Sequence, residues 1–383
     1  MVICFSRCFS DSFLEYIIFK GEKMNVLEIC KQFSIEGDII SVEPYGEGHI
    51  NSTFLVETNV KKYILQKVNG AVFKNPVHVI ENIDLVTAFL SKKIAAEGGD
   101  PERETLTLIP AKNGEKHIID DGELYRVYIF IDKTKCYQLI DNSDVLYKAA
   151  KAFAKFMKNV AAFDASKLHE TIANFHNTAD RYNNFIKAVE ADKVGRLASV
   201  LPEVEFVKAR KADTELVVNK LQSGDIPLRV THNDTKVNNI LMDAESGEGL
   251  CVIDLDTVMP GSLLYDFGDS LRFGASSAAE DETDLDKVYF RLEMFEAFAK
   301  GFLEEMSECI TKSEVELLAF SVKLLTLECG MRFLTDYLDG DNYFKIHYPN
   351  HNLDRARNQF KLVSDMEMKM EQANDIVRKY YPF

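Results

Sequence analysis

Tryptophan is missing from the 383 residues, and cationic residues are scarce beside acidic ones, with 45 Lys and Arg against 61 Asp and Glu. The net charge of −16 leaves no positive footprint of the kind that nucleic acids and anionic membranes require, so we expect neither as a partner. No apolar run approaches the ~18 residues of a membrane span. The acidic surplus favours solubility, and it does not forbid a phosphate-bearing ligand that a few local donors hold.

The cysteines form no bridge or metal framework. There are seven, an odd number, and no two form a C-x-x-C pair. This usage fits free thiols in a reducing cytoplasm and argues against a disulfide scaffold or a zinc site. A sulfatase is excluded because neither C-x-P-x-R nor S-x-P-x-R occurs to supply the modified nucleophile. We expect a cytoplasmic protein.

The first 23 residues lack the features of a targeting segment. Ser, Arg and Asp interrupt their apolar stretches, and no small-residue cleavage site follows. The alternative, a membrane-surface helix, would need a basic face that is missing. An amphipathic helix begins at Met24, so we expect residues 1–23 to be a non-native or disordered extension.

Length and pattern predict two lobes. Hydrophobic residues make up 46% of the chain, enough for a sizeable core. Short β-branched runs and turns at 24–131, with one helical period at 79–90, indicate a small antiparallel sheet with one helix. The expected fold is α+β, because residues 132–383 are mainly helical and a hairpin is their only β interruption. The helices of this second lobe are expected at 145–160, 185–198, 204–221, 285–306 and 313–337.

The most informative stretch runs from His232 to Asp256. Its first half reads H-x-D-x-x-x-x-N, with Asp234 and Asn239, and leads into an apolar strand. Its second half is another apolar strand that ends at Asp254. A hairpin would bring these three side chains to one end of a sheet. A carboxylate that accepts a hydroxyl proton, beside an amide oxygen and a carboxylate that hold Mg²⁺ on ATP, is what phosphoryl transfer needs.

Each of these residues alone has a plainer explanation, because Asp and Asn favour loops and an aspartate often ends a strand. The ordered match, with an apolar strand after each half, is much harder to obtain by chance. We therefore interpret Asp234 as the catalytic base and Asn239 and Asp254 as Mg²⁺ ligands.

Candidate nucleotide contacts lie upstream. Gly46 and Gly48 sit in a strand–turn–strand and would let backbone amides approach phosphate, although a plain hairpin turn has the same pattern. An adenine could pair with backbone groups around Phe130 and Ile131, where the last strand of the first lobe meets a polar hinge.

A strand at 61–68 carries Lys67, the expected phosphate-orienting cation. Glu81, in the first turn of the following helix, is its expected ion-pair partner. A solvated surface pair is the equally plausible alternative.

Longer motifs extend the pattern over nearly the whole chain after Met24. They are HNDTKVNNILMD, VIDLDTVMPGSLLYDFGDSLRFG, YILQKVN, VFKNP, LHETIANFHNT and CGMRFLTDYLDGDNYFK. Together these segments resemble the N-acetylhexosamine 1-kinase branch of the kinase-like phosphotransferases, the family of aminoglycoside and choline kinases. H-N-D-T-K-x-N-N followed by I-D-L-D-T-V-M-P-G is specific to this branch, whereas the wider family more often has H-G-D. At Lys67 the branch often carries arginine instead.

The resemblance implies a two-lobed protein-kinase-like fold and the ATP- and Mg²⁺-dependent phosphorylation of the anomeric (C1) hydroxyl of GlcNAc or GalNAc. It matches Asp234 to the base that meets this hydroxyl, and His49, Arg332 and Tyr343 to sugar-contacting positions. From the residues alone, His49 would be a solvated loop tip, Arg332 an exposed helix cation and Tyr343 a core aromatic. A buried Asp266 is implied to accept hydrogen bonds from the catalytic-loop backbone, a structural role.

Two alternatives stay open. A phosphotransferase for another small alcohol, such as choline, homoserine or an aminoglycoside, would use the same chemistry, and 15 Tyr and 26 Phe are enough to cage a cation. A catalytically inactive nucleotide-binding module would keep the fold, although Asp234, Asn239 and Asp254 are all present. The sequence leaves open both the preferred epimer and whether the protein is a monomer or a homodimer.

Overall fold

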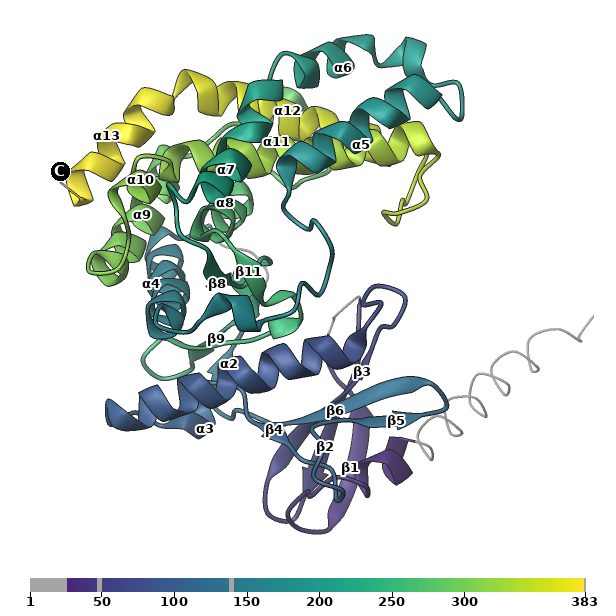
Figure 1. The fold of residues 1–383 in the computed structure, drawn as a ribbon, viewed down its shortest axis with the longest axis vertical. Helices are drawn as coiled ribbons and strands as arrows, with labels where there is room; N and C mark the ends of the chain where they lie inside the picture. Colours follow the sequence, from purple (N-terminus) through teal and green to yellow (C-terminus); the bar gives the residue numbers. More distant parts are fainter. Residues whose placement is uncertain (1–25, 47–49, 138–140, 382–383) are drawn as a thin grey trace, which may run out of the picture. The chain divides into compact units, whose positions relative to one another are not determined.

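The computed structural model describes residues 26–46, 50–137 and 141–381. The chain divides into two compact units, Met1–Asp132 and Lys133–Phe383 (Figure 1). The expected extension at 1–23 lies outside the described residues.

The first unit is built on a six-stranded antiparallel sheet (Figure 1). Its strands lie in the order β1 (Ile39–Pro44), β2 (Ser52–Thr58), β3 (Lys62–Val68), β6 (Glu123–Ile129) and β4 (Leu108–Ile109), and β5 (Ile118–Asp120) also pairs with β6. Two helices follow β3 in the chain, α2 (Pro76–Ala96) and the one-turn α3 (Pro101–Glu104). Proline at the first position starts α2, and the 3–4 residue spacing of its buried positions gives it one apolar face.

A helical segment at 26–30 closes one face of the sheet. Its buried side chains, together with Phe33, pack against Tyr63 and Leu65 of β3 and Val127 of β6. Successive side chains of a strand point to opposite faces, so Gln66 lies on the other face.

The second unit is mainly helical, and α11 (Leu318–Asp339) is buried along most of its length. Side chains of α11 form a hydrophobic core with those of α5 (Thr178–Ala191) and α12 (His351–Met368). The remaining helices are α4 (Ser143–Val160), α6 (Leu201–Lys208), α7 (Lys211–Ser223), α8 (Leu263–Gly274), α9 (Leu292–Met306), α10 (Lys312–Val315) and α13 (Met370–Tyr380), and 3-10 turns occur at η1 (Ala165–Lys167), η2 (Leu197–Ser199) and η5 (Leu285–Lys287).

Two small antiparallel sheets interrupt these helices. One has the order β10 (Gly249–Val252), β9 (Ile240–Asp243) and β7 (Thr134–Lys135), and the other pairs β11 (Met259–Gly261) with β8 (Arg229–Thr231). The expected hairpin is the β9–β10 pair. The expectation that it is the only β structure of this region is wrong, because β7, β8 and β11 are also present.

The α+β class expected from the sequence is confirmed, with an antiparallel sheet in the first unit and helices dominating the second. Within the described residues, no helix has both the length and the apolar character needed to cross a membrane.

Candidate active site

Both ends of the loop 232–239 are anchored in sheet. β8 leads into the loop and pairs with β11, while β9 follows the loop and pairs with β10. A 3-10 turn, η3 (Val237–Asn239), compacts the chain just before β9. The polar loop between β8 and β9 therefore has two fixed ends, which lets its side chains converge.

Hydrogen bonds connect the three residues predicted to carry the chemistry. Asn239 Nδ2 donates to the Asp234 carbonyl oxygen (2.8 Å) and approaches Asp234 Oδ2 at 3.4 Å. The Ile253 N–H donates to the Asn239 carbonyl oxygen (2.9 Å), which brings the next residue, Asp254, to the same end of the hairpin. Asp254 has left-handed backbone angles (φ 57°, ψ 56°) before η4 (Leu255–Thr257), a conformation that aspartate and asparagine adopt more readily than most other non-glycine residues.

His232 braces the loop from the core. Its ring is fully buried and makes edge contacts with Phe153 and Phe156 of α4, with centroids 5.9 and 6.2 Å apart. Its Nε2 donates to the Ile253 carbonyl oxygen (2.8 Å), and its Nδ1 accepts from the Asp234 N–H (3.3 Å). One ring proton satisfies both contacts, so His232 has a structural role.

Asp266, in the first turn of α8, holds the loop as expected. Its carboxylate oxygens accept from the backbone N–H groups of His232 (2.8 Å) and Asn233 (2.6 Å), and its carbonyl oxygen accepts from the Thr235 hydroxyl (2.6 Å). Burial raises the pKa of Asp266 to about 6, although His232 and the two backbone donors act in the opposite direction.

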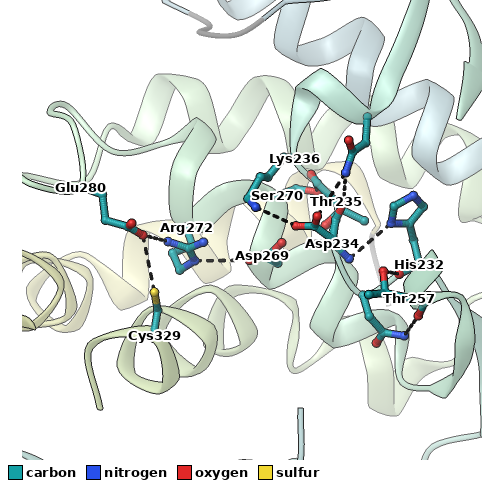
Figure 2. A network of polar contacts seen from close by, with 12 residues as sticks. His232, Asp234, Thr235, Lys236, Thr257, Asp269, Ser270, Arg272, Glu280 and Cys329 are labelled. Carbon is teal, nitrogen blue, oxygen red and sulfur yellow. Dashed lines mark hydrogen bonds and ion pairs between the residues drawn. The ribbon is translucent and has the colours of Figure 1, made fainter. Parts of the chain in front are cut away.

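Lys236 is a site residue to which the sequence analysis gave no role. Its Nζ lies 3.0 Å from Asp234 Oδ1. The negative charge of this carboxylate raises the pKa of Lys236, and its effect is larger than that of burial, which acts to lower the pKa. Figure 2 shows the two side chains facing each other, beside a chain of contacts from Asp269 through Arg272 to Glu280. The sequence could have indicated this pairing, because the spacing D-x-K places Asp234 and Lys236 within one loop.

The donor set fits a magnesium ion. Asp234, Asn239 and Asp254 supply carboxylate and amide oxygens at one end of the β9–β10 hairpin, and Mg²⁺ prefers oxygen ligands. The Asn239 amide nitrogen is used within the loop, which leaves its Oδ1 as the ligand atom. Asn239 and Asp254 are the residues that would hold the ion.

Arg332 and Tyr343 lie together, as the sequence analysis placed them at one site. The Arg332 guanidinium carbon lies 5.9 Å from the Tyr343 ring centroid, 5.6 Å from that of Phe344 and 5.8 Å from that of Phe175. Only 19% of the Arg332 side chain is exposed, whereas Tyr343 is 71% exposed, so neither the exposed cation nor the core aromatic considered from the residues alone is correct. His49, the third predicted sugar contact, lies outside the described residues.

We call the charged groups around Arg332 the arginine cluster: Arg332 and Glu328 of α11, Arg181 of α5 and His176 before α5. Glu328 Oε1 lies 3.0 Å from His176 Nδ1 and 4.0 Å from Arg332 Nη1. Burial, followed by repulsion from Arg332, lowers the pKa of Arg181. Two of the four groups of the cluster are arginines, and the carboxylates of Asp180 and Asp269 also act on Arg181 and His176, respectively.

The arginine cluster is connected to the catalytic loop. His176 Nε2 lies 3.1 Å from the carbonyl oxygen of Asn233, the residue before Asp234. This connection is formed by His176 and Glu328, for which the sequence pattern indicated no role, although His176 is the second histidine of the quoted segment LHETIANFHNT.

In the first unit, the predicted ion pair between Lys67 and Glu81 is wrong. Lys67 pairs with Glu123 of β6 at 3.1 Å, and not with Glu81 of α2. The reason is strand alternation: Lys67 lies opposite Tyr125 in the register and shares the face of Tyr63, which the segment 26–30 covers.

Gln66 lies on the opposite face of β3 from Lys67, with a buried cation beside it. Arg126 of β6 is 1% exposed and donates to Gln66 Oε1 from Nε (3.0 Å) and Nη2 (2.8 Å). The sequence pattern indicates no role for either residue.

The other predicted nucleotide contacts are placed as follows. Gly46 has φ 79°, which glycine adopts without strain, while Gly48 lies outside the described residues. The Phe130 N–H donates to the Lys62 carbonyl oxygen (3.0 Å), so of the Phe130 backbone only the carbonyl is left for a base, and Ile131 is buried.

Comparison with known proteins identifies the family. Residues 41–295 match the model of the phosphotransferase enzyme family (APH). The fold is similar to that of a microcompartment-associated aminopropanol kinase, with a TM-score of 0.62 and 15% identity over 92% of this chain and 98% of that one. It is also similar to an aminoglycoside phosphotransferase from Alicyclobacillus acidocaldarius, with a TM-score of 0.58 and 12% identity over 92% and 95% of the two chains. A spectinomycin phosphotransferase in complex with ADP and spectinomycin has a TM-score of 0.53 and 13% identity over 91% and 98%.

The kinase-like fold expected from the sequence is thereby confirmed. The family model covers well over half of the chain and includes the whole catalytic loop, so the protein belongs to the phosphotransferase enzyme family.

Proposed function

We propose that this protein transfers the γ-phosphoryl group of ATP to the anomeric (C1) hydroxyl of a free N-acetylhexosamine, GlcNAc or GalNAc, in the presence of Mg²⁺. The motifs H-N-D-T-K-x-N-N and I-D-L-D-T-V-M-P-G support this branch of the family. The observation that carries the choice of acceptor is the charge of the arginine cluster.

The positive charges of Arg332 and Arg181 favour a neutral sugar over a cationic amine as the acceptor substrate. The related structures include kinases of amine-bearing acceptors, aminopropanol and aminoglycosides. A cationic amine beside Arg332 and Arg181 would be repelled, because both guanidinium groups stay charged and Glu328 is shared with His176. A neutral sugar with hydroxyl and acetamido oxygens instead offers acceptors to guanidinium donors. Tyr343, largely exposed beside Arg332, adds an aromatic face for a sugar ring.

In the proposed reaction, Asp234 accepts the proton of the C1 hydroxyl as the sugar oxygen bonds to the γ-phosphorus and the bond to ADP breaks. The products are sugar 1-phosphate, ADP and a proton. Lys236 and Asn239 hold the two carboxylate oxygens of Asp234, so the base is oriented before the acceptor arrives. Mg²⁺, when bound, neutralises charge on the phosphates. Gly46, Gly48 and the backbone near Phe130 and Ile131 are proposed nucleotide contacts.

An acceptor panel tests the proposal. ADP release with Mg-ATP is measured for GlcNAc, GalNAc, 1-amino-2-propanol, choline and kanamycin, and NMR of the product locates the phosphate. We expect turnover of at least one acetamido sugar, with phosphate on C1. The methyl glycoside of the same sugar is the matched control, because it has no free anomeric hydroxyl and should give no product. Turnover of an amine with none of either sugar would replace the proposal, and nucleotide binding without any turnover would indicate an inactive module.

A further inference from the structure

His176 lies at a junction that none of the catalytic roles uses. It precedes α5, is 8% exposed, and packs against Phe175 and Tyr265, with ring centroids 4.6 and 5.4 Å away. Its Nδ1 lies 3.0 Å from Glu328 Oε1, and its Nε2 lies 3.1 Å from the Asn233 carbonyl oxygen.

Both neighbours of the His176 ring accept hydrogen bonds. A carbonyl oxygen cannot donate, and an ionised carboxylate cannot either, whereas a neutral imidazole carries only one donor. With Glu328 ionised, both short contacts are satisfied only when the ring carries two protons, so the geometry then places an imidazolium between Glu328 and Asn233.

The charged surroundings support this protonation state. Glu328 of α11 and Asp269, Asp266 and Tyr265 of α8 lie close to His176. Arg332 of α11 and Arg181 of α5 act on Glu328. Burial by itself would lower the pKa of His176, but the charge and hydrogen bond of Glu328 outweigh it and raise the pKa. The positive charges of His176 and the two arginines likewise keep the pKa of Glu328 below its usual value despite burial.

His176 acts on the peptide group that precedes the catalytic carboxylate. The carbonyl of the Asn233–Asp234 peptide accepts from His176, and the N–H of the same peptide donates to His232 Nδ1 (3.3 Å). Asn233 has a left-handed backbone (φ 66°), and its own N–H is held by Asp266. Two histidines thus hold opposite edges of one strained peptide plane, and the plane sets the direction in which the Asp234 side chain leaves the backbone.

We propose that His176 is a positioning residue for phosphoryl transfer: its doubly protonated ring fixes the Asn233–Asp234 peptide, and through Glu328 it links this peptide to Arg332. The inference rests on the proposed role of Asp234 as the base. Glu328 is suited to the link because it is 2% exposed and contacts both cations. The Oε2 atom of Glu328 has no hydrogen-bond partner among the described residues. It can therefore accept one more hydrogen bond when the sugar substrate binds at Arg332.

The link has a defined pH signature. A group whose pKa is raised by folding keeps its contribution at low pH and loses it as the pH rises through the folded-state pKa. When His176 loses a proton, the one that remains is drawn to Nδ1 by the Glu328 carboxylate, and the Asn233 carbonyl loses its donor. We therefore expect kcat to fall on the alkaline side of the profile, while the KM for ATP changes little.

Two substitutions separate positioning from packing. His176→Phe keeps a ring but no donor, and we expect it to lower kcat roughly 10–100-fold, the size of effect that a small misplacement of a catalytic group produces. His176→Gln supplies one amide donor that does not titrate, so kcat should recover most of the loss and the alkaline limb should disappear. Glu328→Gln should move this limb to lower pH. His117→Gln, in the first unit, is the matched control and should keep the wild-type profile.

A second measurement does not depend on turnover. Nitrogen-15 NMR of the histidine rings, assigned by comparison with His176→Gln, should show both nitrogens of His176 protonated at pH 7 and the ring deprotonating above the normal histidine range. A singly protonated His176 at pH 7 would overturn the proposal even if no acceptor were found. An unchanged kcat in His176→Phe, or an alkaline limb that persists in His176→Gln, would overturn it where turnover is measurable. Failure of the sugar acceptors alone would affect only the proposed function.

Discussion

At the residue scale, Asp234 is oriented from three sides. Lys236 lies beside one carboxylate oxygen, Asn239 beside the other, and the peptide that leads into Asp234 is held at both edges by His232 and His176. The proposed base, held in this way, would need little reorganisation when a hydroxyl arrives, which is how positioning contributes to phosphoryl transfer.

Asp234→Asn tests the base directly. The amide keeps the shape of the side chain but cannot accept the proton, so we expect turnover to fall by ~10²–10⁴-fold while ATP affinity stays within a few-fold. Steady-state kinetics and nucleotide titration measure the two quantities. A variant that kept more than roughly a tenth of the wild-type rate would show that Asp234 is not the base.

Arg332→Lys tests the acceptor side. A lysine keeps the charge but cannot present two aligned donors, so the KM for the sugar should rise and kcat/KM should fall by roughly 10–100-fold. The KM for ATP should stay within about twofold, because the substitution removes hydrogen-bond donors to the sugar and none to the nucleotide. Arg357→Lys on α12, where the arginine pairs with Glu203, is the matched control and should leave both KM values unchanged. An equal loss for both substrates would point to a damaged fold, and no effect would remove Arg332 from the acceptor site.

Prediction from sequence succeeds for residues that one short stretch brings together. Asp234 and Asn239 lie just before the β9–β10 hairpin and Asp254 just after it, so their spacing alone indicates that they lie near one end of this hairpin. The pair His176 and Glu328 is separated by 152 positions, and no local period connects the two. Lys67 was placed correctly on a strand, but its ion-pair partner depends on which face of the sheet it occupies, and that depends on packing with the segment 26–30.

At the scale of elements, the helix expected at 145–160 corresponds to α4, whereas other helices are shifted or missed. The helix expected at 185–198 lies at Thr178–Ala191, the one expected at 285–306 begins only at Leu292, and α8, α12 and α13 were not expected. The helix expected at 204–221 is divided into α6 and α7, and the one expected at 313–337 into α10 and α11. The apolar periodicity continues on both sides of each break, so the periodicity alone does not show where one helix ends and the next begins. β8 and β11 have three residues each, too few for an alternating pattern to be read, yet their pairing anchors one end of the catalytic loop.

Gly268 tests how closely α8 must approach α11 to bring Asp266 beneath the loop. A Cβ at Gly268 would lie 2.5 Å from the Ser321 carbonyl oxygen, a backbone atom that cannot move aside cheaply. We expect Gly268→Ala to lower the free energy of unfolding by about 1–2 kcal/mol, because the strain of overpacking exceeds the gain in helix propensity. The measurement is denaturant unfolding.

Gly274→Ala on the same helix is the control for Gly268→Ala. Its Cβ would meet the Leu146 Cδ1 at 3.1 Å, and a side-chain tip can shift. This variant should be nearly neutral, because it gains the same helix propensity without the backbone clash. Equal stability of the two variants would show that α8 and α11 have room to separate.

At the scale of the whole molecule, the net charge of −16 describes the surface and not the site. Acidic residues dominate the composition, yet two arginines of the cluster lie near each other, and repulsion from Arg332 adds to burial in lowering the pKa of Arg181. Net charge bears on partners such as nucleic acid, whereas the proposed choice of a sugar over an amine rests on a few residues of α5 and α11.

Ligand linkage tests whether the motif residues hold a metal–nucleotide complex in the folded protein. A ligand that binds only the native state stabilises it by about 2.7 kcal/mol at a hundred times its Kd, which for a chain of this length corresponds to a rise in Tm of about 3 °C. We expect Mg-ATP to produce such a rise and EDTA to abolish most of it. Asp254→Ala should lose most of the Mg²⁺-dependent part, because it removes an oxygen ligand, while Asp375→Ala, an exposed aspartate on α13, should keep it. If Asp254→Ala showed the full wild-type shift with Mg-ATP, the metal would have to be held by other residues, and the assignment of Asp254 would fail.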